Sequence, residues 1–224
     1  MTFSIAARCP LSGMFGAATT TRNIAVGGRC IFARAGIGAV ITQHVTDPGL
    51  GHRGLEFLAS GRTARQVIDD LVANNPTIAW RELAVVDGGG CTAHYHGDRV
   101  TSIHGAWAGE GCVTIGNGLA DLGVPTAMGR AFQGAPTAPM AERLLRGLEA
   151  GLAAGGMVEP LETAGLLVVD KDVFPLVDLR IDMAPQPLVA LRALWRTYEP
   201  MVDYFRDRAI DPDGVASPLN PGVA

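Results

Sequence analysis

The sequence predicts an α+β fold in which two stacked antiparallel sheets lie between outer layers of helices. Predicted strands follow one another in pairs joined by short turns, as in hairpins, and predicted helices also come in pairs. A doubly wound parallel sheet would alternate single strands with single crossover helices, so this order argues against it. No linker or shift in composition divides the chain. We therefore expect one domain over residues 1–208 and a loosely ordered tail over residues 209–224.

The chain opens with a strand that begins almost at its first residue. Phe3 and Ile5 alternate with Thr2 and Ser4, which is the two-residue period of a half-buried strand. Terminal residues usually fray unless a strand or helix holds them in place. We therefore expect the N-terminus to lie inside the fold.

A turn over residues 9–13 predicts a hairpin between this strand and a second strand over residues 14–19. Small residues dominate the second strand, which indicates close packing against a neighbour. A glycine-punctuated connection over residues 26–36 leads to a third strand over residues 38–44. The glycines of this connection are not followed by Lys-Ser or Lys-Thr, so it does not match a phosphate-binding loop.

Two helices are expected next. The first follows Asp47 and ends at Gly61, and a capping box of Thr63 and Gln66 starts the second. Pro76 lies just beyond the expected end of the second helix, where a helix cannot continue.

Hairpins and helices continue in the same order through the rest of the chain. The Asp-Gly sequence in the turn over residues 87–90 is typical of a tight hairpin, and Pro200 is expected to kink or end the last helix. The remaining expected strands cover residues 82–86, 91–96, 113–117, 165–170 and 175–181, and the remaining helices cover residues 125–133, 139–154 and a segment from Leu188.

The composition bears on whether the protein binds nucleic acid or a membrane. A net charge of -4 and a pI of about 5.7 give no sign of a basic surface for nucleic acid. No run approaches the roughly 20 apolar residues of a membrane span, and no basic and then apolar leader precedes the first strand. We therefore expect no nucleic-acid partner, no membrane partner and a cytoplasmic location. The 4 cysteines are scattered without a Cys-x-x-Cys pair, unlike a zinc or redox motif.

Thr2 is the candidate catalytic residue. Met1 is expected to be removed because a small residue follows it, and removal leaves Thr2 with a free α-amine beside its hydroxyl. A hydroxyl is a weak nucleophile until a base takes its proton, and an N-terminal amine with a pKa of roughly 7.7–8.0 suits that task. The alternative is that Thr2 is only a β-branched strand residue after the start codon.

Seven segments carry a resemblance to a known family: residues 2–8, 28–40, 42–43, 46–51, 83–87, 116–117 and 166–169. Together they resemble the DUF1028 family over residues 1 to about 200. The resemblance implies the fold of an N-terminal-nucleophile (Ntn) hydrolase, which is a four-layer αββα sandwich, and a place in that superfamily of amide-cleaving enzymes. It supplies no substrate.

Roles for individual residues follow from the chemistry of that fold. Thr2 would attack a carbonyl carbon with its own amine as base, while N–H groups hold the oxyanion. Gln43 and Asn117 are the candidate donors or substrate ligands, with capping of backbone groups as the alternative. Arg29 or Arg34 is the candidate for binding a substrate carboxylate, with a structural ion pair as the alternative. We expect Arg29, Gln43 and Asn117 to lie around the Thr2 hydroxyl in one cleft.

One segment departs from the family pattern. Family members usually carry a polar Arg-Gln-Ser-Ala type of segment before the strand at residue 166, whereas residues 157–164 of this chain are acidic and contain Glu159 and Glu162. If this segment lines the site, it alters the choice of substrate or the activity itself.

Two other functions stay open. His94, His96 and His104 offer ligands for a metal ion, but no His-Glu-x-x-His motif accompanies them, and the alternative is that they are strand-surface histidines. The second alternative is a catalytically inactive Ntn-fold protein that binds a ligand or has a structural role. For the enzyme we expect a small-molecule or peptide amide as substrate and no cofactor, and a homo-oligomer is compatible with the sequence.

Overall fold

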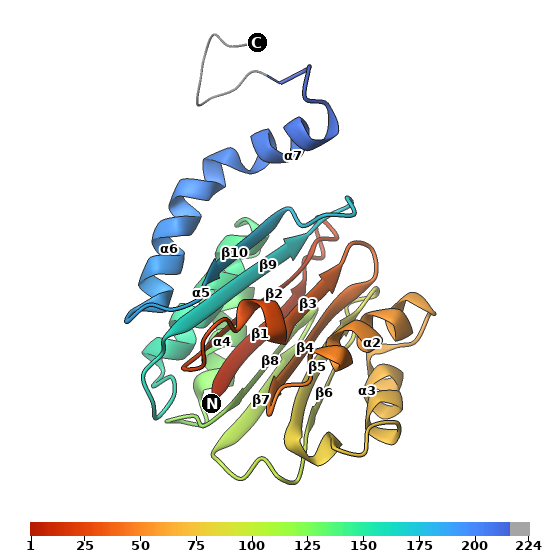
Figure 1. Cartoon of the computed structure of the whole chain (residues 1–224), viewed down its shortest axis with the longest axis vertical. Coiled ribbons are helices and arrows are strands. Elements are labelled where there is room, and N and C mark those ends of the chain that lie inside the picture. Colours follow the sequence, from red (N-terminus) through yellow and green to blue (C-terminus); the bar gives the residue numbers. More distant parts are fainter. Residues whose placement is uncertain (216–224) are drawn as a thin grey trace.

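Two antiparallel sheets are stacked between outer layers of helices (Figure 1), and the computed structural model describes residues 1–215 of the chain. The strands are β1 (Thr2–Arg8), β2 (Phe15–Thr21), β3 (Ile31–Arg34), β4 (Gly38–His44), β5 (Arg81–Asp87), β6 (Thr92–His96), β7 (His104–Gly109), β8 (Cys112–Asn117), β9 (Thr163–Val169) and β10 (Val177–Ile181). One sheet has six strands in the order β10-β9-β2-β1-β8-β7, and the other has four in the order β3-β4-β5-β6.

Helices cover the outer face of each sheet. The helices are α1 (Gly27–Cys30), α2 (Pro48–Ala59), α3 (Ala64–Ala73), α4 (Val124–Gln133), α5 (Met140–Ala153), α6 (Pro187–Tyr198) and α7 (Val202–Ile210), with short 3-10 helices at Ile78–Trp80 and Glu199–Met201. The six-stranded sheet packs against α4, α5 and α6, and the four-stranded sheet packs against α2 and α3. The predicted four-layer αββα sandwich is therefore confirmed. Within residues 1–215, every helix is too short or too polar to cross a membrane.

Apolar side chains form a separate core at each of the three boundaries between layers. In β1, Phe3 and Ile5 lie in the core under the helices, whereas Ser4 faces the four-stranded sheet and hydrogen-bonds to Gln43. The strand is therefore buried on both faces, and the prediction of a half-buried strand was wrong on this point. The reason is that helices cover one face of β1 and a second sheet covers the other.

The predicted helix starts are confirmed in atomic detail. The carboxylate of Asp47 accepts a hydrogen bond from the Gly49 N–H at the start of α2. Thr63 and Gln66 form both hydrogen bonds of the predicted capping box at the start of α3. Such caps satisfy backbone N–H groups that have no partner inside the helix.

The sequence analysis missed two strands, β3 and β7. β3 has only four residues and follows the short helix α1 directly, and both lie within residues 26–36, where the glycines predict a long connection. β7 contains small residues and no clear alternation, and its partner β8 supplies the pairing. At the other end of the chain, α6 ends at Tyr198 and a 3-10 turn that contains Pro200 separates it from α7, so the predicted interruption at Pro200 is confirmed. Residues 216–224 of the predicted tail lie outside the described residues.

Glycines in α5 let this helix approach the strand that carries Thr2. A Cβ atom on Gly151 would lie 2.7 Å from Met128 Cγ and 3.1 Å from Phe3 Cε2. A Cβ atom on Gly147 would lie 3.1 Å from Ile5 Cδ1. The depth at which α5 packs on β1 therefore depends on the absence of side chains at these two positions.

We predict that Gly151→Val lowers the free energy of unfolding. The added side chain overlaps Met128 and Phe3, and overpacking of this kind typically costs about 1–3 kcal/mol. Ala153→Val is the matched control, because it places the same β-branched side chain on an exposed position of the same helix. Chemical denaturation of both variants measures the difference, and equal midpoints would contradict the close approach of α5 to β1.

Candidate functional site

Thr2 lies at the start of β1, between two strands of the six-stranded sheet. In the strand register it pairs with Thr21 on β2 and with Asn117 on β8. The Thr2 hydroxyl donates a hydrogen bond to Thr21 Oγ1 at 3.1 Å, and the Thr21 hydroxyl donates to the carbonyl oxygen of Met1. The side of Thr2 that carries its hydroxyl is thus held against polar groups, and the residue is only 5% exposed.

Gln43 connects Thr2 to the opposite sheet. It is the penultimate residue of β4 and is fully buried. Its amide nitrogen donates to the Thr2 carbonyl oxygen at 3.3 Å and to Glu82 Oε2 at 2.9 Å. Its amide oxygen accepts a hydrogen bond from the Ser4 hydroxyl at 2.6 Å. All the hydrogen-bonding groups of this amide therefore point into the space between the sheets.

Glu82 is the buried charged group of this region. It is fully buried on β5, directly opposite Gln43 on β4 and opposite His96 on β6. Its Oε2 accepts hydrogen bonds from the amide nitrogens of Gln43 and Asn117, and its Oε1 lies 2.6 Å from His96 Nδ1. An ionised carboxylate without partners would be very costly to bury, so these three contacts are what permit Glu82 at this position.

Two polar atoms beside Glu82 are left without a partner. Among the described side chains, Asn117 Oδ1 and His96 Nε2 are buried and have no hydrogen-bond partner. His96 Nδ1 lies against the Glu82 carboxylate and donates to it when it carries the proton, so Nε2 is the ring nitrogen that is left without a contact. Buried polar atoms without partners are uncommon in proteins and are often found where a substrate or a water molecule binds.

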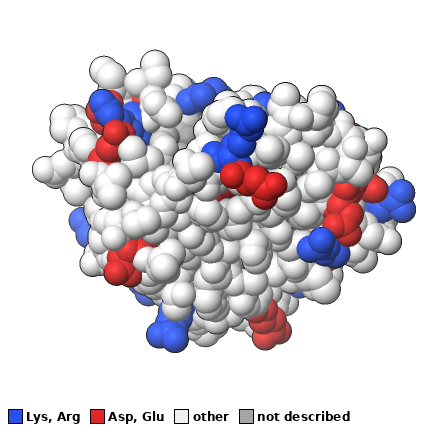
Figure 2. Space-filling model, turned by 90° about the horizontal axis from the view of Figure 1, so that it is seen from below, with Lys and Arg blue, Asp and Glu red and all other residues white. Residues whose placement is uncertain are grey.

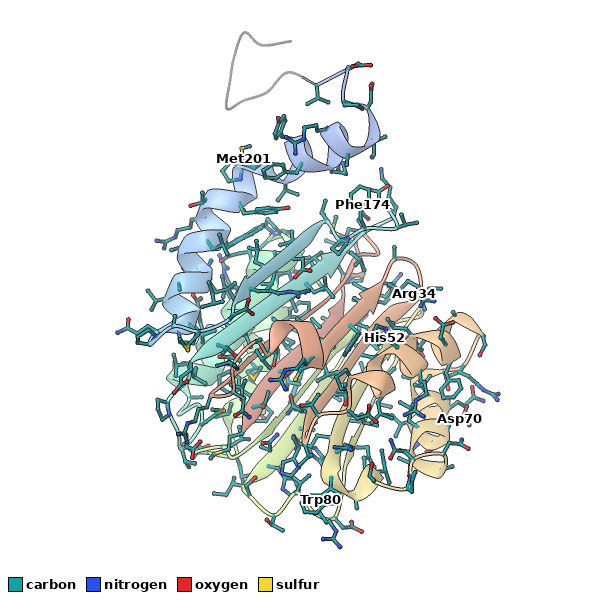
Figure 3. All side chains as sticks on the ribbon, in the orientation of Figure 1. Arg34, His52, Asp70, Trp80, Phe174 and Met201 are labelled. Carbon is teal, nitrogen blue, oxygen red and sulfur yellow. The ribbon has the colours of Figure 1, made fainter. Side chains whose placement is uncertain are left out.

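The two arginines proposed as carboxylate ligands lie elsewhere. Arg29 of α1 is exposed, and its guanidinium donates to the carbonyl oxygens of Ile24 and Ala25 in the loop that precedes this helix. Arg34 forms an ion pair with Glu56 of α2 at 2.5 Å. It lies at the end of the four-stranded sheet opposite to that of Trp80 (Figure 3). Of the predicted residues, the structure therefore brings Gln43 and Asn117 to Thr2 but leaves both arginines in other contacts.

Arg34 is too far from Thr2 to share its cleft. It pairs with Gly38, at the opposite end of β4 from Gln43. Five residues of strand correspond to roughly 17 Å. Arg34 instead borders a groove of about 740 Å³ at that far end, lined by residues of α1, β3, α2, β9 and β10. The proposal that Arg34 holds a substrate carboxylate beside Thr2 is therefore corrected by the geometry.

The three histidines proposed as metal ligands lie side by side, with His104 brought to the other two by β7. The ring centroids of His94 and His96 are 5.6 Å apart, and those of His96 and His104 are 5.0 Å apart. Burial lowers the pKa of His94, so its ring is neutral at pH 7. The Nδ1 atoms of His96 and His104 are engaged by Glu82 and by the Ser102 carbonyl oxygen. In the part of the chain that the structure describes, no three metal-binding side chains are arranged to hold an ion.

The acidic segment that departs from the family pattern does lie next to the site. The Glu162 N–H donates to the carbonyl oxygen of Thr21, and the Val158 N–H donates to that of Gly118. The charge of Glu159 is paired with Arg22 at 2.9 Å. The segment is thus fixed beside the residues that flank Thr2, and one of its two negative charges is compensated.

Sequence reasoning missed Glu82, and it named His96 only as a possible metal ligand and not as a partner of Glu82. A signal was present for Glu82, because a carboxylate stands at the start of an otherwise apolar run, Leu83–Val86. Its burial depends on donors from β4, β6 and β8, which are far apart in the sequence. Only the pairing of these strands shows that the carboxylate has partners.

Comparison with known proteins identifies relatives of this chain. The model of the DUF1028 family, described as a family of unknown function, matches residues 2–191. A crystal structure of a DUF1028 protein from Silicibacter pomeroyi is 31% identical with a TM-score of 0.82, and the match covers 88% of this chain and 85% of that chain. No curated protein matches the sequence.

Two more distant structures are Anbu (ancestral beta-subunit) from Yersinia bercovieri and Anbu from Hyphomicrobium sp. strain MC1. They are 10% and 12% identical to this chain, and both have a TM-score of 0.39. The matches cover 92% and 93% of this chain and 97% of each Anbu chain. Likeness at this level supports no conclusion about this chain. The family model matches residues 2–191, and the Silicibacter protein is similar over most of both chains. These two findings show that the chain belongs to the DUF1028 family.

Proposed function

We propose that this protein is an Ntn-type amide hydrolase in which Thr2 is the nucleophile after Met1 is removed. The observation that carries the proposal is the position of Thr2 at the first residue of a buried strand, beside the polar cluster of Gln43, Glu82 and Asn117. The αββα sandwich is the architecture expected for such an enzyme. The substrate would be an amide of a small molecule or a peptide.

The first half of the reaction would acylate Thr2. The free α-amine takes the proton from the Thr2 hydroxyl, whose oxygen attacks the carbonyl carbon of the amide. The tetrahedral intermediate then collapses, the carbon–nitrogen bond breaks, and the protonated amine gives its proton to the leaving nitrogen. The second half reverses these roles with water as the nucleophile, which releases the carboxylic acid and restores the hydroxyl.

Asn117 is the preferred candidate for the oxyanion donor. It is the register partner of Thr2, and one N–H of its amide is engaged by Glu82, which leaves the other N–H free to donate. Gln43 already donates to the Thr2 carbonyl and to Glu82, so its role would be to position Thr2. Glu82 would act through both amides, because its carboxylate fixes their orientation.

A catalytically inactive binding protein is the second candidate. The observation that favours it is the acidic segment 157–164, which is fixed beside the residues that flank Thr2 through bonds from Glu162 and Val158. With Met1 attached, the nitrogen of Thr2 is an amide and cannot serve as a base. In that form the polar cluster would bind a ligand without cleaving it.

We predict that the functional protein lacks Met1. Intact-mass measurement of the protein purified from its native host tests this directly, because loss of one methionine changes the mass by a known amount. Quantitative retention of Met1 would rule out the amine as base and would make the binding protein the better proposal.

Substitution of the nucleophile tests the reaction itself. In the processed protein, Thr2→Ala should lower kcat/KM by more than about a thousandfold, because the amine remains but the hydroxyl is lost. Thr2→Ser keeps a hydroxyl and should retain part of the activity. Both variants must be checked for loss of Met1. Equal turnover by the parent and Thr2→Ala would end the proposal.

Replacement of the buried carboxylate should weaken both activity and stability. In Glu82→Gln the new amide group faces donors from Gln43, Asn117 and His96, so at least one contact becomes unfavourable. We expect a loss of about 1–3 kcal/mol in unfolding free energy. Displacement of the two amides should also lower kcat by roughly 10–100-fold.

The matched control for this change is Glu56→Gln. Glu56 also has a side-chain partner, Arg34, but its side chain is 67% exposed and lies in the outer helix layer. Exposed ion pairs contribute little, so both unfolding and turnover should stay close to those of the parent. Chemical denaturation and steady-state kinetics compare the two variants. Equal effects of both substitutions would mean that Glu82 has no special role.

A further inference from the structure

Met1 is held at the site in the manner of a bound amide. Its carbonyl oxygen accepts a hydrogen bond from the Thr21 hydroxyl, and Thr21 Oγ1 is also the partner of the Thr2 hydroxyl at 3.1 Å. The carbonyl of Met1 therefore lies on the same polar group that touches the proposed nucleophile. A substrate amide brought to Thr2 would have to use this region.

The side chain of Met1 fills a seat that only glycine permits. A Cβ atom on Gly118 would lie 1.9 Å from Met1 Cγ and 2.4 Å from Met1 Sδ, so any other residue at 118 would collide with Met1. Gly118 also has a φ of 61°, a conformation that favours glycine. Met1 is partly buried against the core that contains Leu119 and Met157. We call the surface formed by Gly118, Leu119 and Met157 the Met1 seat.

The segment 157–164 closes one side of this seat. Met157 and Leu119 form an isolated antiparallel bridge, and the Val158 N–H donates to the carbonyl oxygen of Gly118 at 3.1 Å. Val158 itself is 65% exposed. The part of the chain that departs from the family pattern therefore supplies apolar residues to the surroundings of the seat, in addition to its two acidic residues.

The end of the sandwich around the seat is apolar and poor in charge. Figure 2 shows the molecule from this end, and most of the central surface carries neither acidic nor basic side chains. Large apolar residues are exposed in the loops that adjoin the Thr2 ends of the strands. These residues are Ile24, Val45, Trp80, Ile103, Leu122, Val158 and Met183.

The charged groups near the seat are already engaged. Arg22, which reaches the segment 157–164, is paired with Glu159 at 2.9 Å. The carboxylate of Asp121 accepts from the Gly123 N–H at 2.6 Å and would repel a second carboxylate. A negatively charged group in the seat would therefore lose its hydration without meeting an unpaired arginine beside this segment, and the proposed mechanism uses the α-amine of Thr2 as a neutral base.

We propose that, once Met1 is removed, the Met1 seat binds an uncharged apolar group attached to the scissile amide of the substrate. The group would be of about the size of a methionine side chain. The inference rests on the proposed function and adds to it the chemical class of the substrate: an amide of an apolar acyl group, not of a dicarboxylic acid.

Two anilides of the same chain length test this substrate class. Hexanoyl p-nitroanilide and adipoyl mono-p-nitroanilide both carry six-carbon acyl chains, but the second ends in a carboxylate. The processed full-length protein should hydrolyse the hexanoyl compound with a kcat/KM at least about tenfold higher, because burial of an unpaired carboxylate is costly. Equal or better turnover of the adipoyl compound would overturn the inference while leaving the proposed hydrolase intact.

Variants with an added positive charge test whether the preference for the hexanoyl anilide arises at the Met1 seat. Val158→Lys places a cation beside the seat, at an exposed position where folding should be unaffected, and should lower KM for the adipoyl anilide and raise KM for the hexanoyl anilide. Val173→Lys is the matched control, because Val173 is fully exposed in the hairpin between β9 and β10 at the other end of the sandwich. If both variants have the same effect on the ratio of the two KM values, the seat is not the binding site.

A binding measurement separates this inference from the hydrolase proposal. If the processed protein cleaves neither anilide, the backbone N–H signal of Gly118 in NMR spectra still reports on the seat. Addition of hexanamide should shift that signal, whereas adipic acid monoamide and the Met1-bearing protein should give no shift. The absence of a hexanamide-dependent shift in the processed protein would overturn the inference.

Discussion

The carboxylate of Glu82 is enclosed between the two sheets, and the polar side chains near Thr2 are arranged so that this group has partners. The donors come from the neighbouring strands β4 and β6 and, through Asn117, from the opposite sheet. Because a buried charge that loses a partner is strongly unfavourable, the two sheets are held in one relative position at this end of the sandwich. The apolar core between the sheets has no comparable directional preference.

This constraint reaches Thr2 through two amides. Gln43 bridges Glu82 and the Thr2 carbonyl, and Asn117 bridges Glu82 and the strand beside Thr2. On the other face of β1, the glycines of α5 let the helix pack closely on Phe3 and Ile5. The first residues of the chain are thereby fixed from both sides, which is unusual for a terminus and suits a site that depends on a precisely placed hydroxyl.

Met1 covers an apolar surface at the same end of the molecule. It covers Gly118 and is hydrogen-bonded through its carbonyl to Thr21, so processing would both release the α-amine of Thr2 and expose an apolar surface next to it. The exposed apolar loops and the scarcity of charge around this surface favour an uncharged group there. Activation and substrate choice would thus depend on the same residue.

The sequence by itself determined the fold class, the helix caps and the position of Thr2, because periodicity, turn residues and capping boxes are local. It also singled out Gln43 and Asn117, which stand at strand ends. It could not decide which side chains meet across the sandwich. From the sequence, Arg29 and Arg34 were as suitable as Gln43 for contacting a substrate at Thr2. In the structure, Arg29 donates to the loop before α1 and Arg34 lies at the far end of β3. Glu82 became recognisable only in the tertiary structure, since its partners are separated by tens of residues and are united by strand pairing and sheet stacking alone.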